Sequence, residues 1–176
     1  MEFQQLSIPD VILVKPTVFE DQRGFFMESY HIDKFELGGI DCIFVQDNHA
    51  KSIHNTLRGL HSQVHFPQAK LLRCLKGKVF DVAVDIRKDS PNFGMWVGKE
   101  LSEYNRCQLF IPKGFAHGYY VMSEMAEIAY KCSEIYHPED ELGIIWNDPE
   151  IGIKWPTHAP ILSEKDKNNI LLKDLF

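Results

Sequence analysis

Two residues that can do chemistry, Arg58 and His61, interrupt a segment that otherwise has the pattern of a strand, TLRGLHSQ at residues 56–63. An arginine carries a permanent positive charge, and a histidine changes its protonation state near neutral pH. On a strand, His61 shares one face with Gln63 and His65, because alternate residues point the same way. Two interpretations follow for His61: a core histidine whose ring nitrogens are satisfied by neighbours, or a base in a binding site.

A second candidate lies in IPKGFAHGYY at residues 111–120, where the pattern P-x-G-x-x-H ends at His117. Proline and glycine set a tight turn, and the histidine stands at the start of the next strand. The pattern matches part of the second motif of cupin barrels, whose first motif holds a metal through H-x-H and a carboxylate. The matching place here reads His-Ser-Gln at 61–63. The broken motif predicts that no metal binds here. The alternative is a metal ion held by His61, His65 and His117.

Residues 19–30, FEDQRGFFMESY, place charged side chains among aromatic rings. The simplest interpretation is a solvated turn with a few ion pairs. Aromatic rings beside an arginine also suit a nucleotide base and its phosphate. The side chains concerned are Asp21, Arg23, Glu28, Phe19, Phe25, Phe26 and Tyr30.

The elements that must position these residues are mostly strands. The clearest is KVFDVAVDIR at residues 78–87, where side chains alternate with period two and turn residues stand on both sides. Tyr130 shares a strand face with Ile128 and Cys132, which by itself indicates only core packing. Further strands are predicted at residues 11–17, 24–30, 41–48, 56–63, 70–77, 95–101, 107–112, 117–123 and 126–137. Many short strands separated by Gly, Pro, Asp and Asn predict a sandwich or barrel.

Short helices are predicted only near the ends of the chain. HIDKFELGG at residues 31–39 ends in two glycines, and residues 162–176 form a second candidate. In the latter, Ser163 and Asp166 fit the S-x-x-[DE] capping box, which offers a purely structural interpretation of Asp166. We therefore predict a mostly β fold with short flanking helices, in one domain spanning residues 1–176.

Composition narrows the class of protein. The 176 residues are 44% hydrophobic and 25% charged, the balance of an ordinary soluble globular chain. The net charge of -6 argues against non-specific nucleic-acid binding, while it allows a local cationic pocket. The sequence contains no long apolar run and no signal-peptide pattern at its start, so no membrane association is expected. The four cysteines form no C-x-x-C pair and are predicted to be buried thiols of a cytoplasmic protein.

Short motifs run in order through nearly the whole chain. They are D-x-R-G-F-F-x-E at 21–28, Q-D-N at 46–48, L-R-G-L-H-x-Q at 57–63, K-L at 70–71, D-V-A-V-D-I-R-x-x-S-P at 81–91, I-P-x-G-F-A-H-G at 111–118, Tyr130, G-I-x-W-N-D-P at 143–149 and L-S-x-K-D at 162–166. Each motif is weak alone, but the ordered set is specific. In this combination the sequence resembles the dTDP-4-dehydrorhamnose 3,5-epimerase family.

The resemblance implies a cupin-like jelly-roll barrel that works as a homodimer without metal or cofactor. The implied substrate is a nucleotide-diphosphate 4-keto-6-deoxy sugar. The implied reaction inverts C3 and C5, the carbons on either side of the ketone, by removing and returning protons through an enolate.

The resemblance also implies roles for single residues. His61 would be the base, Asp166 its hydrogen-bond partner, Lys70 the stabiliser of the enolate oxygen and Tyr130 the acid on the opposite face. The implied substrate-binding residues are Arg23, Phe26, Glu28, Gln46, Asn48, Arg58, Lys70, His117, Glu141 and Lys165. Arg58 and His61 are three positions apart, so on a regular strand they point to opposite faces. A bulge at Gly59 would let both face one cavity; otherwise one of them would face a pocket shared with a dimer partner.

The sequence departs from the family pattern N-x-S-x-S-x-x-G-x-L-R-G, which here reads NHAKSIHNTLRG. Ala50 replaces the first serine, Asn55 replaces the glycine, and Ser62 stands where an aromatic residue is common. These departures leave three alternatives. One is a relative acting on a GDP-linked or heptose 4-keto sugar, at one carbon or both; the others are a metal-dependent cupin enzyme and a non-catalytic sugar-nucleotide binding module.

Overall fold

A computed structural model of the chain describes residues 1–175, which are built mainly from strands. The strands are β1 Glu2–Gln5, β2 Ile12–Lys15, β3 Val18–Asp21, β4 Gly24–Met27, β5 Gln46–Ile53, β6 Leu57–Gln63, β7 Lys70–Lys76, β8 Lys78–Asp85, β9 Trp96–Ser102, β10 Gln108–Ile111, β11 Phe115–Val121, β12 Met125–Cys132 and β13 Glu141–Gly143. The helices are α1 Ile32–Leu37 and α2 Glu164–Lys167, with 3-10 turns at Pro138–Asp140 and Leu172–Asp174. The prediction of a mostly β fold with short helices is confirmed.

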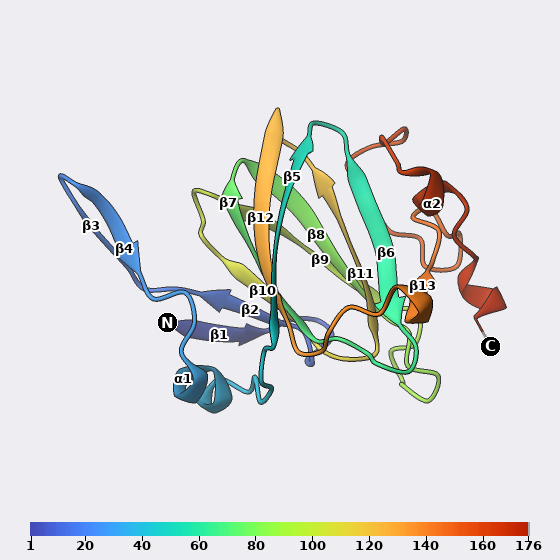
Figure 1. Cartoon of the computed structure of the whole chain (residues 1–176), viewed down its shortest axis with the longest axis horizontal. Coiled ribbons are helices and arrows are strands. Elements are labelled where there is room, and N and C mark those ends of the chain that lie inside the picture. The colour runs from blue at the N-terminus through green and yellow to red at the C-terminus, as the bar shows by residue number, and fades with distance from the viewer. Residues whose placement is uncertain (176) are drawn as a thin grey trace.

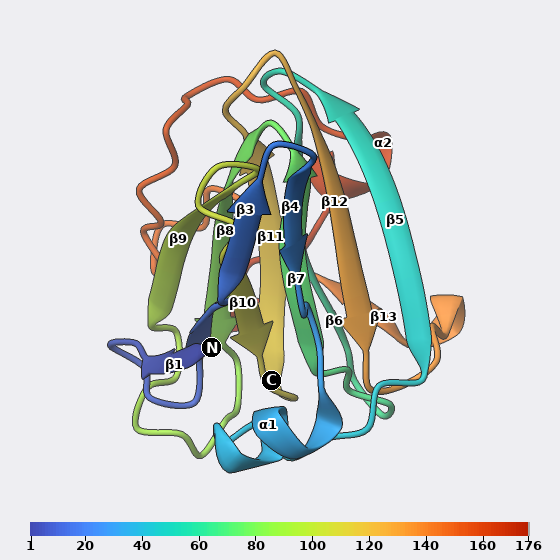
Figure 2. The same ribbon diagram turned by 90° about the vertical axis from the view of Figure 1, so that its left-hand side faces the viewer.

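Two antiparallel sheets form the body of the molecule (Figures 1 and 2). One has the order β1-β2-β10-β7-β12-β5, and the other has the order β13-β6-β11-β8-β9. Strands β3 and β4 form a separate hairpin that projects away from both sheets (Figure 1). Neighbouring strands are often distant in sequence, as in β10 beside β7 and β12 beside β5, which is the crossing connectivity of a jelly roll.

Strand β8 shows how the core is layered. Val79 and Ala83 pack between the two sheets, whereas Val82 and Val84 pack against the C-terminal segment that covers the outer face. The predicted period-two pattern of this strand is confirmed, but both of its faces are buried. The reason is that the C-terminal segment contributes Ile144, Ile151, Trp155 and Leu172 to this second apolar cluster.

Several predicted boundaries differ from the structure. The strand predicted at 41–48 begins at Gln46 and extends to Ile53, and the strand predicted at 126–137 ends at Cys132. The helix predicted for 162–176 is confirmed only in part: within the described range it consists of the four residues of α2, followed by a short 3-10 turn. Leu172 packs into the apolar cluster on the outer face of β8, and this tertiary contact replaces helical continuation.

No helix within residues 1–175 has the length and apolar character needed to cross a membrane.

Candidate active site

A cavity of about 580 Å³ lies between the two sheets. Strands β5, β7 and β12 of one sheet and β6, β11 and β13 of the other contribute to its wall, and the segment that leads into α2 closes one side. Its volume falls in the range of small-molecule sites, roughly 300–1,000 Å³. The residues that line it are Gln46, Asn48, Ala50, Thr56, Leu57, Arg58, His61, Ser62, Gln63, Gln68, Lys70, His117, Tyr119, Tyr130, Tyr136, Glu141, Ile161, Leu162, Ser163, Lys165 and Asp166.

His61 and Asp166 form a hydrogen-bonded pair in the cavity wall. His61 Nε2 lies 2.5 Å from Asp166 Oδ1, and the carboxylate is almost fully buried. Burial is the largest single influence and by itself would raise the pKa of Asp166, but the hydrogen bond and electrostatic attraction of His61, together with smaller contributions from Ser163 and Gly59, hold that pKa below its ordinary value. An ionised carboxylate can only accept, so Nε2 carries a proton, and in the neutral imidazole Nδ1 is the nitrogen that keeps its lone pair.

Asp166 also satisfies the predicted capping box in part. Its backbone N–H donates to Ser163 Oγ at 3.0 Å, as expected for an N-cap serine. Its carboxylate does not return to the backbone of Ser163 but engages His61. Asp166 therefore has both roles at once: its backbone N–H takes part in the helix cap, and its carboxylate binds His61.

A β-bulge brings Arg58 and His61 into the same cavity. In the ladder between β6 and β11, His61 pairs with His117 but Arg58 pairs with Tyr119, so one strand holds an extra residue. Gly59 lies at the bulge with φ +114, and a Cβ there would come within 2.6 Å of the backbone of β11. The predicted bulge is confirmed, and only glycine fits it.

Lys70 and Tyr130 line the cavity from the six-stranded sheet, whereas His61 belongs to the five-stranded sheet. Tyr130 and His61 therefore stand on facing walls. Burial raises the pKa of Tyr130 to about 12, so its phenol is protonated at neutral pH. Burial also lowers the pKa of Lys70 below its ordinary value, although the nearby Cys132 and Glu141 oppose this shift.

His117 lines the cavity from β11 and is held from behind by Asp81 of β8. His117 Nε2 lies 2.7 Å from Asp81 Oδ1, and both side chains are buried. Burial lowers the pKa of His117, against the opposing influence of Asp81. In the sequence, Asp81 appears as the first residue of the D-V-A-V-D-I-R-x-x-S-P motif at 81–91 and has no predicted role in the site.

Arg58 is fixed by a short chain of polar contacts. Its Nε donates to Ser52 Oγ at 3.1 Å, and Ser52 Oγ lies 3.4 Å from Tyr119 Oη. At the far end of β5, Gln46 Nε2 donates to Asn48 Oδ1 at 3.1 Å. Strand β5 therefore orients Arg58 and places two amide side chains on the same cavity wall.

Glu141 joins two cavity residues at the rim. Its carboxylate accepts the Tyr136 hydroxyl at 2.5 Å and a short hydrogen bond from Lys165 Nζ. Burial disfavours the charged form of Glu141, but these hydrogen bonds hold its pKa below the ordinary value. The motifs did not identify Tyr136, because an exposed tyrosine in a loop carries no periodic pattern; only its place in the cavity wall marks it.

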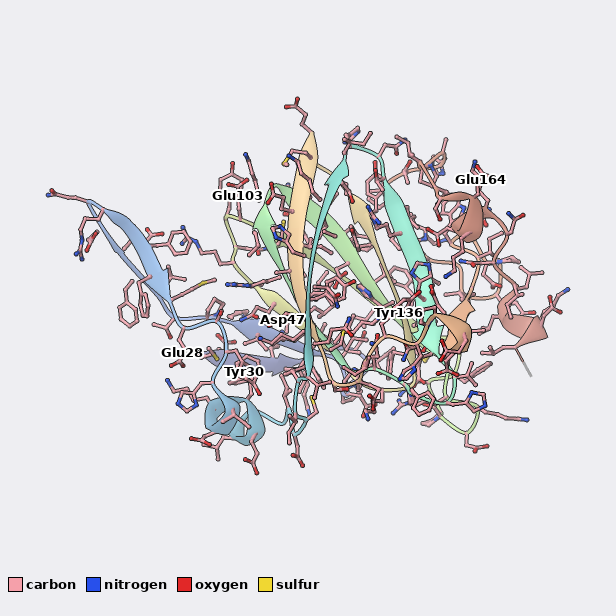
Figure 3. All side chains as sticks on the ribbon, in the orientation of Figure 1. Glu28, Tyr30, Asp47, Glu103, Tyr136 and Glu164 are labelled. Carbon is pink, nitrogen blue, oxygen red and sulfur yellow. The ribbon has the colours of Figure 1, made fainter. Side chains whose placement is uncertain are left out.

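Arg23, Phe26 and Glu28 are not brought to this cavity. They lie on or beside the β3–β4 hairpin, where Arg23 pairs with Asp21, Phe26 is 70% exposed and Glu28 pairs with Lys34. In Figure 3, Glu28 lies at the left, near the base of the hairpin, whereas Tyr136 lies well to its right, beside β13.

The alternative histidine set does not converge. His65 lies beyond β6, is 80% exposed in its side chain and binds Asp140 Oδ1 at 2.6 Å, away from the cavity wall. Within residues 1–175, no group of three or more His, Cys, Asp or Glu side chains is arranged to hold a metal ion.

Residues 5–174 match the family model described as dTDP-4-dehydrorhamnose 3,5-epimerase. The chain is 53% identical over 176 residues to the dTDP-4-dehydrorhamnose 3,5-epimerase of Pseudomonas aeruginosa, covering 99% of this chain and 97% of that protein. It is 52% identical over 179 residues to the Escherichia coli K12 enzyme of the same name, with 100% and 97% covered. The crystal structure of dTDP-6-deoxy-D-glucose-3,5-epimerase from Legionella pneumophila in complex with dTDP-4-keto-L-rhamnose superimposes with a TM-score of 0.96 at 47% identity, covering 99% of this chain and 94% of that chain. With its cupin-like fold and a match over nearly its whole length, this chain belongs to the dTDP-4-dehydrorhamnose 3,5-epimerase family.

Proposed function

We propose that the chain inverts C3 and C5 of a nucleotide-linked 4-keto-6-deoxy sugar of the dTDP-4-dehydrorhamnose type. Family membership supports this activity, and one geometric observation carries it: His61 and Tyr130 face one cavity from opposing sheets. Inversion at a carbon needs a base on one face and an acid on the other. The relatives, whose names specify a dTDP-linked substrate, support thymidine as the nucleoside.

His61 is the proposed base. A hydrogen on the carbon next to the C4 ketone is acidic because its removal leaves an enolate. The C–H electrons form the new C=C bond, the carbonyl oxygen takes the negative charge, and His61 Nδ1 takes the proton. Asp166 stabilises the resulting imidazolium through Nε2, to which it is hydrogen-bonded at 2.5 Å.

Lys70 is the proposed stabiliser of the enolate oxygen. Burial lowers the pKa of its ammonium, and the nearby Cys132, Glu141 and Asp81 oppose that shift. A cation in a partly dry cavity stabilises a developing oxyanion more strongly than it would in water.

Tyr130 is the proposed acid. Because its pKa is raised to about 12, it holds a proton at neutral pH and donates it to the carbanion from the wall opposite His61. Proton return from that wall leaves the carbon inverted. Return from His61 itself would only exchange the hydrogen with solvent.

The remaining cavity residues are proposed to bind the substrate. Arg58, held by Ser52, suits the diphosphate, because a guanidinium binds phosphate oxygens through paired hydrogen bonds. Tyr136 is 46% exposed as a residue and lines the cavity, where its ring offers a stacking surface for the base. Gln46 and Asn48 supply amides for the nucleoside, His117 lines the sugar pocket, and Glu141 and Lys165 close the rim.

We also propose that the chain acts as a homodimer in which the partner's β3–β4 hairpin reaches this cavity. The hairpin carries Arg23 and the exposed rings of Phe19, Phe25 and Phe26, which are 64%, 56% and 70% exposed. A projecting hairpin with so many apolar rings in solvent suits a protein interface. Residues 1–176 would then act as one epimerase domain per protomer.

Mixed dimers test the hairpin's place. Consider a dimer of one His61→Asn chain and one Arg23→Ala chain, in which each hairpin acts on the partner's cavity. The cavity of the Arg23→Ala chain then has its own His61 and the partner's Arg23 and is intact, whereas the other cavity has both defects. Mixed dimers should therefore recover activity that neither parent homodimer has. If the hairpin acted within its own chain, every site would carry one defect and no activity would return.

The activity itself is tested by incubating dTDP-linked and GDP-linked 4-keto-6-deoxy sugars with the enzyme in D2O and following C3 and C5 by NMR. We expect deuterium at both carbons and inversion at both with the dTDP sugar. Exchange confined to one carbon would identify a single-carbon epimerase, and preference for the GDP sugar would overturn the nucleotide assignment. Binding without exchange would identify a binding module.

A cytoplasmic location is part of the proposal. Within the described residues all four cysteines are free, which suits a reducing compartment. Cys74 and Cys132 are buried as predicted, whereas Cys42 and Cys107 are only partly buried.

A further inference from the structure

Asn55 stands in the turn between β5 and β6 with a backbone conformation that few side chains adopt. Its φ is 65°, in the left-handed region. Asparagine tolerates this region better than most residues, and glycine tolerates it best. The turn therefore does not need a side chain for its backbone geometry, and the contacts of the Asn55 amide are a separate feature.

The Asn55 side chain holds a segment that is far away in sequence. Its Oδ1 accepts hydrogen bonds from Tyr120 Oη at 3.1 Å and Thr157 Oγ1 at 3.0 Å. Its Nδ2 donates to the Ala159 carbonyl oxygen at 2.8 Å. Thus one amide joins the β5–β6 turn to strand β11 and to the segment at residues 157–159.

The backbone extends this junction by two residues. Ile161 N donates to the Asn55 carbonyl at 2.7 Å, and Leu57 N donates to the Ile161 carbonyl at 3.0 Å. An isolated parallel bridge joins Thr56 to Ile161. Residues 157–161 are therefore fixed on the same turn whose following strand carries Arg58 and His61.

The held segment leads directly into the active site. Ile161, Leu162 and Ser163 line the cavity, and Ser163 caps the four-residue helix α2. That helix is too short to be stable alone, so its place is set by what anchors its ends. It carries Asp166, whose Oδ1 lies 2.5 Å from His61 Nε2.

We propose that Asn55 is a positioning residue for the His61–Asp166 pair. Its amide clamps residues 157–159 onto the turn that begins β6 and so sets the register of α2 against His61. The inference rests on the proposed epimerase function and adds a determinant of its rate that acts through the position of Asp166.

The test uses Asn55→Gly, which suits the left-handed backbone and removes only the amide. We expect its turnover for deuterium exchange to fall about tenfold, since small displacements of catalytic groups cost rate steeply. Its affinity for dTDP should change little, because Gln46, Asn48 and Tyr136, which are proposed to bind the nucleoside, are held by contacts outside α2. Asn55→Asp keeps the acceptor oxygen for Tyr120 and Thr157 but loses the donor to the Ala159 carbonyl, so it should recover only part of the loss.

Two further variants separate positioning from stability. Thr157→Val removes one donor to the amide from the other side and should lower turnover in the same direction. Asn105→Gly is the matched control: Asn105 also makes three turn hydrogen bonds, to Ser102 N, Cys107 N and the Glu100 carbonyl, but lies outside the cavity wall. It should lose stability without losing turnover.

Amide hydrogen exchange supplies a readout independent of activity. In Asn55→Gly, residues 157–166 should exchange faster than in the wild type, while β8 stays protected. If Asn55→Gly had wild-type turnover and unchanged amide protection at residues 157–166, the positioning role of Asn55 would be refuted. An equal loss of turnover in Asn105→Gly would refute it as well. If the wild type itself exchanged no substrate hydrogen, the proposed function would fail, yet the protection of residues 157–166 would still report on the clamp.

Discussion

Replacing Asp166 by asparagine should slow hydrogen exchange at the substrate about 100-fold. The reason is that Asp166 contributes more by stabilising the positive charge of the His61 imidazolium than by orienting the ring. When His61 takes the substrate proton, its imidazolium and the Asp166 carboxylate lie with charge centres about 4 Å apart, which at an effective dielectric constant near 20 is an attraction of about 4 kcal/mol. An asparagine oxygen still accepts from Nε2 and recovers part of this, which leaves a net loss of about 2–3 kcal/mol. The hydrogen bond of 2.5 Å and the 4% exposure of the Asp166 side chain place the pair where water replaces little of the lost charge.

The assay is deuterium incorporation at C3 and C5 in D2O under saturating substrate, with dTDP affinity measured by calorimetry. Asp140→Asn is the matched control, because Asp140 also binds a histidine, His65, at 2.6 Å and its side chain is 5% exposed, but it lies outside the cavity wall. Both variants should lose thermal stability, and only Asp166→Asn should lose exchange. Near wild-type exchange in Asp166→Asn, or an equal loss in both variants, would refute the assigned role.

Three other outcomes are expected. Tyr130→Phe should retain deuterium exchange better than inversion, because His61 can return a proton to the face from which it was taken. Both rates are measured by NMR, and equal losses of exchange and inversion would contradict an acid on the opposite wall. Lys70→Met should lower turnover by about 100-fold or more with dTDP affinity retained in calorimetry, as for loss of an oxyanion stabiliser. The pKa values of Asp85, Glu141 and Asp166 are lowered in the folded state, where burial is outweighed by hydrogen bonds from Arg87, Lys165 and His61. Their contribution to stability is thus present above pH of about 4.5 and is lost as pH falls through the folded pKa values, so the denaturation midpoint should drop on acidification below that range; a flat profile from pH 5 to 3 would contradict it.

Local patterns were sufficient to predict much of the frame. Alternation at 78–87 predicted a strand, and β8 occupies residues 78–85 of it. The turn residues around HIDKFELGG predicted α1. These elements depend on residues that are close together in the chain, so their positions can be predicted without a tertiary structure.

Other elements depended on distant contacts. The predicted C-terminal helix is limited to Glu164–Lys167, because Leu172 packs on the outer face of the five-stranded sheet. Strand β5 continues to Ile53, through a mostly polar stretch in which hydrophobic and polar residue types do not alternate, because β12 pairs with it along its whole length. Backbone pairing with a partner strand outweighs local preference at such places.

The sequence by itself determined which groups can act: His61, Lys70 and Tyr130 appear in ordered motifs, and Gly59 allows the bulge that Arg58 and His61 require. Only the tertiary structure decided how they meet. It set His61 and Tyr130 on opposing sheets, brought Asp166 onto His61 across 105 positions of chain, added Tyr136 to the cavity wall and directed the hairpin away from it. The physical reason is that side-chain chemistry is local, whereas the distance between two side chains is set by sheet pairing and packing between segments remote in sequence.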